Sequence, residues 1–223
     1  MEYFITGIDT DIGKTFVTKG LALAFNNQGK KTGVFKPLQS GAIKTANGNL
    51  APDLEAVKAV SKNINTKCSY LLEGEVSPAL AARLGGVKID INKIKNDFAQ
   101  FSSLNDVTLV EGAGGILAPV CDDMLCADLI KQLEIPIIIV TVPFLGRLNH
   151  TLLTIYYAKT NNLKIKGLII NKIPDNTKDL AVKNFIDELK MYMDIPILGK
   201  IKDCGKNISY NESIFNIIAE TIS

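Results

Sequence analysis

The sequence predicts an α/β fold in which a parallel sheet carries helices on both faces. The expected strands are largely apolar, as strands buried on both faces are, and nearly every one is followed by a helical pattern. The turn after the first expected strand, at residues 3–5, contains Gly13-Lys14-Thr15 and leads into the first expected helix. A glycine-containing turn between a strand and a helix is typical of α/β proteins that bind phosphate groups.

The other elements follow in alternation. Further strands are expected at residues 34–35, 107–110, 137–142, 167–170 and 195–201. The first helix is expected to end near Gly29, and two more are expected to begin at Pro52-Asp53 and after a capping Asp90. Apolar residues at helical spacing predict further helices at 149–160, 182–193 and 214–222. The polar stretch 44–49 is expected to be a loop.

Composition limits the alternatives. The chain has 223 residues, 47% of them hydrophobic, and no linker divides it, so we expect one domain spanning residues 1–223. The 25 basic and 23 acidic residues are spread along the chain, which argues against a nucleic-acid or membrane partner. The four cysteines form no Cys-x-x-Cys pair, and the N-terminus lacks the basic region of a signal peptide. We therefore expect a cytoplasmic protein with reduced thiols and no zinc site.

Residues 7–15 read GIDTDIGKT, which predicts a phosphate-binding loop. Gly13 lets the backbone pass close to phosphate oxygens, Lys14 adds a positive charge, and the Thr15 hydroxyl suits a magnesium ion. The usual spacing puts a glycine where Ile8 stands, whereas Gly7 comes one residue too early. An ordinary turn that happens to hold a lysine is the alternative. We expect a P-loop NTPase-like fold that binds a nucleoside triphosphate.

Polar residues also stand at the expected carboxyl ends of other strands, where ligands bind in sheets of this class. Lys36 ends the strand at 34–35, and Pro37 should hold its backbone extended and aim its side chain beyond the sheet. Glu111 ends 107–110, and Asn171 ends 167–170. Singly, a surface lysine, a turn asparagine or Asp53 beside a helix dipole has an ordinary structural explanation. Their coincidence on one rim favours a site.

Five segments then form a family pattern. GIDTDIGKT, VFKPLQSGA, VEGAGGILAPV, VPFLGRLNHTLLT and IINKI occur in this order and span nearly the whole chain. Together they closely resemble the dethiobiotin synthetases, the enzymes that close the ureido ring in biotin synthesis. The phosphate loop of that family has the same extra residue. The match is looser between residues 61 and 86, where the family often has a histidine at the position of Ala79.

The resemblance implies an ATP-dependent ligase. Its reaction would convert 7,8-diaminopelargonate, carbon dioxide and Mg-ATP into dethiobiotin, ADP and phosphate, through a carbamate and a carbamic-phosphoric anhydride. Both the carbamate and the triphosphate are anions, so Lys14 and Lys36 would be the catalytic residues that bring them together. Thr15, Asp53 and Glu111 would hold Mg²⁺.

The resemblance also implies binding residues. Thr10 and Ser40 would bind the carbamate or the diamine, and Asn171 would read the purine edge of adenine. Other nucleotide contacts are expected at Asp11, Ile12, Gly13, Lys14, Thr15, Phe16, Glu111, Gly112, Ala113 and Gly114. The substrate carboxylate would be bound by Gly146, Arg147, Leu148 and Asn149 of the neighbouring subunit in a homodimer. His150 is expected to be structural.

Two other classes share parts of this pattern. A nucleotide-driven switch of the partitioning or septum-placement type has the same fold, but its phosphate loop usually carries an earlier second lysine, which residues 6–13 lack. A GTPase is suggested by Asn171-Lys172, but the guanine motif requires an acid where Pro174 stands. Both differences favour the synthetase.

Overall fold

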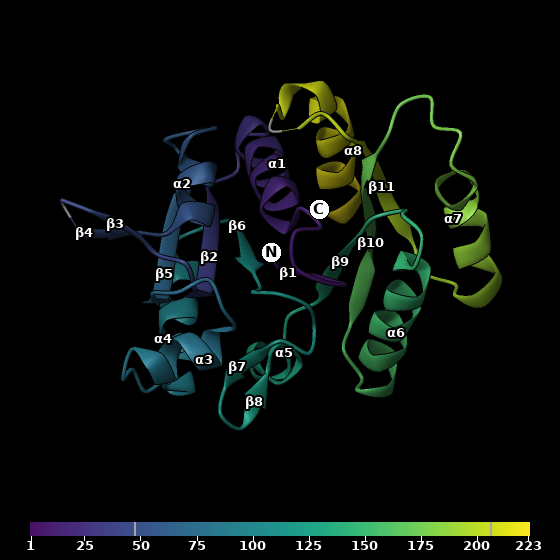
Figure 1. The fold of residues 1–223 in the computed structure, drawn as a ribbon. Helices are drawn as coiled ribbons and strands as arrows, with labels where there is room; N and C mark the ends of the chain where they lie inside the picture. The colour runs from purple at the N-terminus through teal and green to yellow at the C-terminus, as the bar shows by residue number, and fades with distance from the viewer. Residues whose placement is uncertain (47, 206) are drawn as a thin grey trace.

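One seven-stranded parallel sheet organises the chain, in the strand order β11-β10-β9-β1-β6-β2-β5 (Figure 1). The structure is a computed structural model that describes residues 1–46, 48–205 and 207–223. The strands are β1 (Glu2–Gly7), β2 (Thr32–Gln39), β5 (Asn65–Leu71), β6 (Val107–Glu111), β9 (Ile137–Thr141), β10 (Ile165–Ile173) and β11 (Ile197–Lys202). The α/β class and the parallel sheet predicted from the sequence are confirmed.

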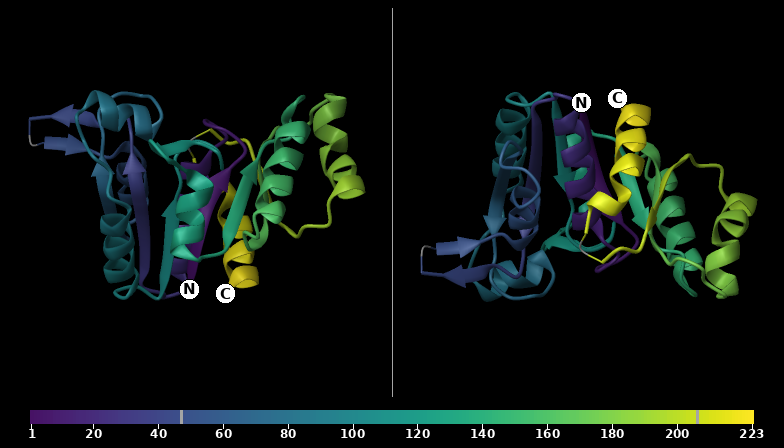
Figure 2. Two further views of the ribbon diagram at one scale, coloured as in Figure 1. Left: turned by 90° about the horizontal axis from the view of Figure 1, so that it is seen from below. Right: turned by 90° about the horizontal axis from the view of Figure 1, so that it is seen from above.

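Helices cover both faces of this sheet (Figure 2). On one face lie α1 (Lys14–Asn27), α2 (Pro52–Lys58) and α8 (Glu212–Ile222), and on the other lie α4 (Ile91–Ser102), α5 (Cys126–Leu133), α6 (Arg147–Thr160) and α7 (Leu180–Tyr192). Strand β1 is largely apolar because both of its faces are buried. Phe4 packs into one core, whereas its neighbours Tyr3 and Ile5 pack into the other.

Several elements were not anticipated from the sequence. Strand β5, the short helix α3 (Pro78–Leu84) and helix α5 all lie in segments to which the pattern assigned no structure. Strand β5 is an edge strand, so most of its residues are half-buried and its sequence, NTKCSYL, lacks the apolar run of a central strand. Periodicity therefore gave little signal there. Two small hairpins complete the fold: β3 (Ile43–Thr45) with β4 (Gly48–Leu50), and β7 (Pro119–Cys121) with β8 (Met124–Leu125).

The expectation that strand β2 ends at Lys36-Pro37 is wrong. The strand continues to Gln39, and Pro37 lies inside it. Pairing with β6 stops at Phe35, opposite Val110, so beyond this point β2 pairs with β5 alone. Proline is tolerated there because its missing N–H interrupts no ladder between β2 and β6. Lys36 therefore extends over the carboxyl end of β6 and not beyond the sheet.

The stretch 44–49, expected to be a loop, contributes to the β3–β4 hairpin, with Asn47 outside the described residues. The hairpin projects from the body beside β5 and β2 (Figure 1). It joins the strand that carries Lys36 to the helix that carries Asp53. In the described part of the chain, no helix combines the length and apolarity needed to cross a membrane.

Close contact between α1 and α8 depends on a glycine. A Cβ on Gly20 would lie 2.3 Å from the Phe215 ring, which is fully buried. We predict that Gly20→Ala lowers the free energy of unfolding by about 1–3 kcal/mol through overpacking. Gly115→Ala is the control, because its Cβ would meet nothing closer than 3.4 Å. Urea unfolding measures both variants, and equal stability of Gly20→Ala and the wild type would contradict the packing argument.

Candidate nucleotide and substrate site

A cleft of about 1070 Å³ opens at the carboxyl ends of β1, β2 and β6. Its walls come from the phosphate loop, the end of β2, the start of α2, the segment before α3 and the glycine-rich turn after β6. The lining residues are Asp9, Thr10, Asp11, Gly13, Lys14, Thr15, Lys36, Leu38, Gln39, Ser40, Gly41, Pro52, Asp53, Glu75, Val76, Ser77, Pro78, Glu111, Gly112, Ala113, Gly114, Gly115, Ala118 and Lys172. Parallel strands place their ligand sites at this edge of the sheet.

The phosphate loop has the backbone shape of an anion-binding nest. Asp11 has φ 57° and Gly13 has φ 90°, so two left-handed residues flank Ile12 just before α1. Such alternation turns successive N–H groups toward one point, where an anion can bind. Gly13 is required for a second reason, because a Cβ there would lie 2.1 Å from Asn171 Nδ2.

Three carbonyl groups of the loop accept hydrogen bonds from side chains. Lys14 Nζ donates to the Asp9 carbonyl at 2.8 Å. Asn171 Nδ2 donates to the Ile12 carbonyl at 2.9 Å, and Lys172 Nζ donates to the Asp11 carbonyl at 2.6 Å. The end of β10 therefore supports the loop through Asn171 and Lys172.

A buried lysine joins the phosphate loop to the rest of the cleft. Lys36 Nζ lies 2.6 Å from Asp53 Oδ2 and 2.9 Å from Glu111 Oε1, and it donates to the Gly112 carbonyl at 3.2 Å. The side chain of Lys36 is 3% exposed and that of Glu111 is 1% exposed. The Thr15 hydroxyl lies 2.8 Å from Glu111 Oε1 and 3.1 Å from Asp53 Oδ1. We call Thr15, Lys36, Asp53 and Glu111 the lysine–carboxylate cluster.

Burial and charge set the ionisation of these groups. Burial disfavours the ammonium of Lys36, but the carboxylates of Glu111 and Asp53 outweigh this effect and raise its pKa. Burial likewise opposes ionisation of Asp53, but Lys36 prevails and lowers its pKa. Lys14 differs, because burial and the nearby charge of Lys36 together lower its pKa. The ammonium group of Lys14 is therefore buried in the cleft without enough nearby negative charge to offset its burial.

The cluster fits a magnesium ion. The Thr15 hydroxyl lies within hydrogen-bonding distance of a carboxylate oxygen of Asp53 and of Glu111, and magnesium prefers oxygen ligands shared with water and phosphate. Glu111 Oε2 is buried and has no hydrogen-bond partner among the described residues. A buried carboxylate oxygen without a partner is costly, and a cation would satisfy it. The described residues contain no cluster of three or more His, Cys, Asp or Glu side chains suited to a metal.

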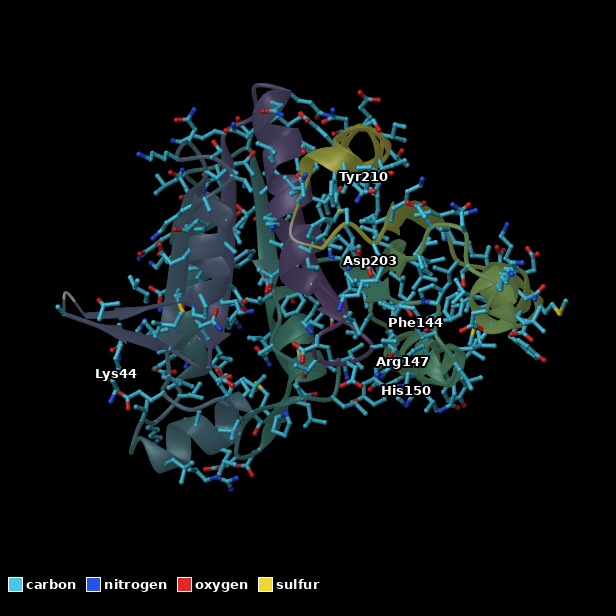
Figure 3. The ribbon with its side chains drawn as sticks, turned by 45° about the horizontal axis from the view of Figure 1, so that its top comes forward. Lys44, Phe144, Arg147, His150, Asp203 and Tyr210 are labelled. Atoms are coloured by element: carbon cyan, nitrogen blue, oxygen red, sulfur yellow. The ribbon has the colours of Figure 1, made fainter. Side chains whose placement is uncertain are left out.

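The loop before α6 lies outside the cleft. Gly146 has φ 82°, and the space around its missing side chain is open. Leu145 is 87% exposed. Arg147 donates to Asp9 Oδ2 at 2.7 Å and contacts His150 Nδ1 at 3.1 Å; Figure 3 shows Arg147 and His150 together, far from Lys44 of the β3–β4 hairpin. The hydrogen bond from Arg147 lowers the pKa of Asp9.

The structure thus divides the residues predicted from the sequence into two groups. The cleft brings together Thr10, Asp11, Gly13, Lys14, Thr15, Lys36, Ser40, Asp53, Glu111, Gly112, Ala113 and Gly114. The residues Ile12, Phe16, Gly146, Arg147, Leu148, Asn149 and Asn171 do not line it. Asn171 is 2% exposed and donates to the phosphate loop, so the hypothesis that it reads the purine edge stays a prediction.

Sequence reasoning missed three parts of the cleft. Asp9 lies inside the loop motif itself and contacts both Lys14 and Arg147. Lys172 follows Asn171 and was considered only for the guanine motif. The wall at residues 75–78 follows β5, the strand that the pattern did not predict. Ala79, where the family often has histidine, is buried in α3 just behind this wall.

Comparisons with known proteins agree with this geometry. A family model described as an AAA domain matches residues 1–205. Among solved structures, the MinD cell division protein of Aquifex aeolicus has a TM-score of 0.63 at 14% identity and covers 99% of this chain and 96% of its own. A ParA family ATPase from Chlorobium tepidum has a TM-score of 0.59 at 13% identity, covering 99% and 92%. These likenesses show the fold, which is that of the P-loop ATPases.

Curated relatives give the family. An ATP-dependent dethiobiotin synthetase of Anoxybacillus flavithermus is 38% identical over 201 residues, which is 89% of this chain and 90% of the relative. Another from Clostridium perfringens is 36% identical over 212 residues, covering 91% and 92%. The chain belongs to the family of ATP-dependent dethiobiotin synthetases, and it is an ATP-dependent ligase of biotin biosynthesis.

The pairing within the lysine–carboxylate cluster predicts how the stability of the fold depends on pH. The pKa of Asp53 is lowered in the folded state, so its pairing with Lys36 stabilises the fold at neutral pH. This stabilisation is lost as the pH falls through the lowered pKa. We predict that the free energy of unfolding, measured in urea without nucleotide or metal, falls less steeply toward acid pH in Asp53→Asn than in the wild type. Parallel curves for the two proteins would contradict the pairing.

Proposed function

We propose that this chain, acting as a single domain, converts 7,8-diaminopelargonate, carbon dioxide and Mg-ATP into dethiobiotin, ADP and phosphate. One observation carries the proposal: two buried ammonium groups, Lys14 of the phosphate loop and Lys36 of β2, share one cleft. Burial and the nearby charge of Lys36 together lower the pKa of Lys14. Anions that bind between them relieve this repulsion.

The reaction requires such an arrangement. One amine of the substrate takes up carbon dioxide and loses a proton, which gives a carbamate. A carbamate oxygen then attacks the γ-phosphorus of ATP and ADP leaves, which gives a carbamic-phosphoric anhydride. The second amine attacks the carbonyl carbon and loses a proton, phosphate leaves, and the ureido ring closes. Catalysis is mainly positioning and charge stabilisation, since the carbamate and the triphosphate repel each other.

The residues of the cleft take distinct roles in this proposal. Lys14 and the N–H groups of the phosphate loop bind the phosphates. Lys36 binds the carbamate oxygens and stabilises the charge on the transferred phosphoryl group. Thr10 and Ser40, both on the cleft wall, hydrogen-bond the carbamate or the diamine. Glu111 and Asp53 keep Lys36 charged, because they raise its pKa.

We further propose that Thr15, Asp53 and Glu111 hold Mg²⁺. Their oxygens lie within 2.8 to 3.1 Å of one another through the Thr15 hydroxyl, and Glu111 Oε2 is unpartnered among the described residues. Bound magnesium supplies positive charge to the phosphate oxygens. The glycine-rich turn from Gly112 to Gly114 lines the same cleft and has little side-chain bulk to exclude the nucleotide.

The substrate carboxylate lies far from the two amines, so its binding site has to be distant from Lys36. We propose that Gly146, Arg147, Leu148 and Asn149 of a second subunit provide it, in a homodimer. The exposure of Leu145 and the open space beside Gly146 support this proposal. Arg147 is already paired with Asp9 of its own chain, so backbone N–H groups at the start of α6 are the better donors to the carboxylate.

The proposed reaction is tested by incubating the protein with diaminopelargonate, bicarbonate and Mg-ATP and detecting the ring product by mass. The expected result is dethiobiotin formed in equal amount to ADP. ATP hydrolysis without ring product would overturn the proposal and favour an ATPase switch.

The two lysines should be separable by mutation. Lys14→Ala should raise the KM for ATP and lower kcat together, because Lys14 belongs to the phosphate loop. Lys36→Gln should chiefly lower kcat, by roughly a hundredfold or more if Lys36 supplies a few kcal/mol to the transition state. Steady-state kinetics distinguish the two, and equal, mild losses in both variants would contradict the assignment.

A shared site predicts complementation between subunits. Lys36→Gln and Gly146→Trp proteins should each be inactive alone. After subunit exchange, a mixture should regain about a quarter of the wild-type activity, because half of the dimers are mixed and each of these has one intact site. Melting temperatures confirm that both variants fold. A monomer by light scattering, or no recovery despite demonstrated exchange, would rule out the shared site.

A further inference from the structure

Lys172 occupies an unusual place at the end of β10. Its backbone is left-handed, with φ 54°, which few non-glycine residues adopt. Its side chain lines the cleft, and Nζ donates to the Asp11 carbonyl at 2.6 Å. The stem runs beside the loop, since Lys172 Cε lies 3.8 Å from the position of a Cβ on Gly13. Left-handed residues of this kind concentrate at functional sites.

The partner of Lys172 is equally unusual. Asp11 is also left-handed, with φ 57°, and this conformation turns the phosphate loop into an anion-binding nest. The side chain of Asp11 is exposed and forms no ion pair with any described residue. Packing therefore does little to hold Asp11 in a conformation that is unfavourable for a residue with a Cβ. Its carbonyl accepts the hydrogen bond from Lys172.

We infer that Lys172 is a positioning residue for nucleotide binding, which acts by holding Asp11 in its left-handed conformation. The inference rests on the proposed nucleotide site and adds a residue to it. Asn171 supports the next carbonyl, that of Ile12, in the same way. The two consecutive residues thus hold two consecutive carbonyls of the loop, and the N–H groups remain turned toward the bound phosphates.

A direct role is the competing explanation. Because Lys172 lines the cleft, its ammonium group could pair directly with phosphate oxygens. Its effect on binding would then not depend on the conformation of Asp11. The two explanations differ in how Asp11 should respond to mutation. If Lys172 holds Asp11 left-handed, a residue that adopts this conformation readily at position 11 makes Lys172 dispensable. If Lys172 binds phosphate by charge, no substitution at position 11 restores the nucleotide affinity that is lost when the ammonium group is removed.

The experiment measures the Kd of Mg-ADP by titration calorimetry. Lys172→Met keeps the stem and removes the ammonium, and it should raise Kd about tenfold, the effect of one charge-assisted hydrogen bond. Adding Asp11→Gly should recover most of this loss, because glycine adopts positive φ at little cost. Lys178→Met, an exposed lysine beyond β10, is the matched control and should leave Kd unchanged.

Kinetics and stability complete the test. Lys172→Met should raise the KM for ATP and leave kcat and the melting temperature close to those of the wild type. If the Asp11→Gly protein fails to fold, Asp11→Asn replaces it, because asparagine also tolerates the left-handed region. An unchanged Kd in Lys172→Met, or a loss that neither substitution at position 11 recovers, would overturn the inference. Absence of ADP binding to the wild type would instead overturn the proposed function.

Discussion

The burial of Lys36 between two carboxylates is the interaction on which the site depends. The side chain of Lys36 is 3% exposed, and its ammonium group joins Glu111 at the end of β6 to Asp53 at the start of α2. A buried charge is tolerated only when it is paired and hydrogen-bonded, and removing one partner is costly. Lys36 therefore fixes β2, β6 and α2 relative to one another. They meet beside the start of α1, where the phosphate loop ends.

The same pairing explains how one cleft can hold two lysines. The carboxylates of Glu111 and Asp53 balance the positive charge of Lys36 and raise its pKa. Burial and repulsion by Lys36 lower the pKa of Lys14. In the proposed reaction, the triphosphate supplies the missing negative charge near Lys14. Glu111 contacts Thr15 as well as Lys36, so the carboxylate links the lysine of β2 to the phosphate loop. A nucleotide bound as proposed would therefore complete the charge balance of the cleft.

The sequence predicted the features that depend on local pattern. The phosphate loop is one such feature, because Gly13-Lys14-Thr15 lies between an apolar strand and a helix, and the central strands are another. It did not predict β5, whose edge position removes the apolar run, or the continuation of β2 through Pro37, which depends on where β6 ends. The pairing of Arg147 with Asp9 and of Lys172 with Asp11 joins residues more than 130 positions apart, so only the folded chain brings them together.

In the proposed function, the lysine–carboxylate cluster receives both the metal and the anions of the reaction. Diffraction from crystals grown with Mn²⁺ in place of Mg²⁺ and with ADP tests it most directly, because the anomalous signal of manganese locates the metal. We expect one peak at metal-bonding distance from the Thr15 hydroxyl and from a carboxylate oxygen of Glu111 or Asp53. A peak elsewhere in the cleft, or nucleotide bound without a peak at this position, would contradict it.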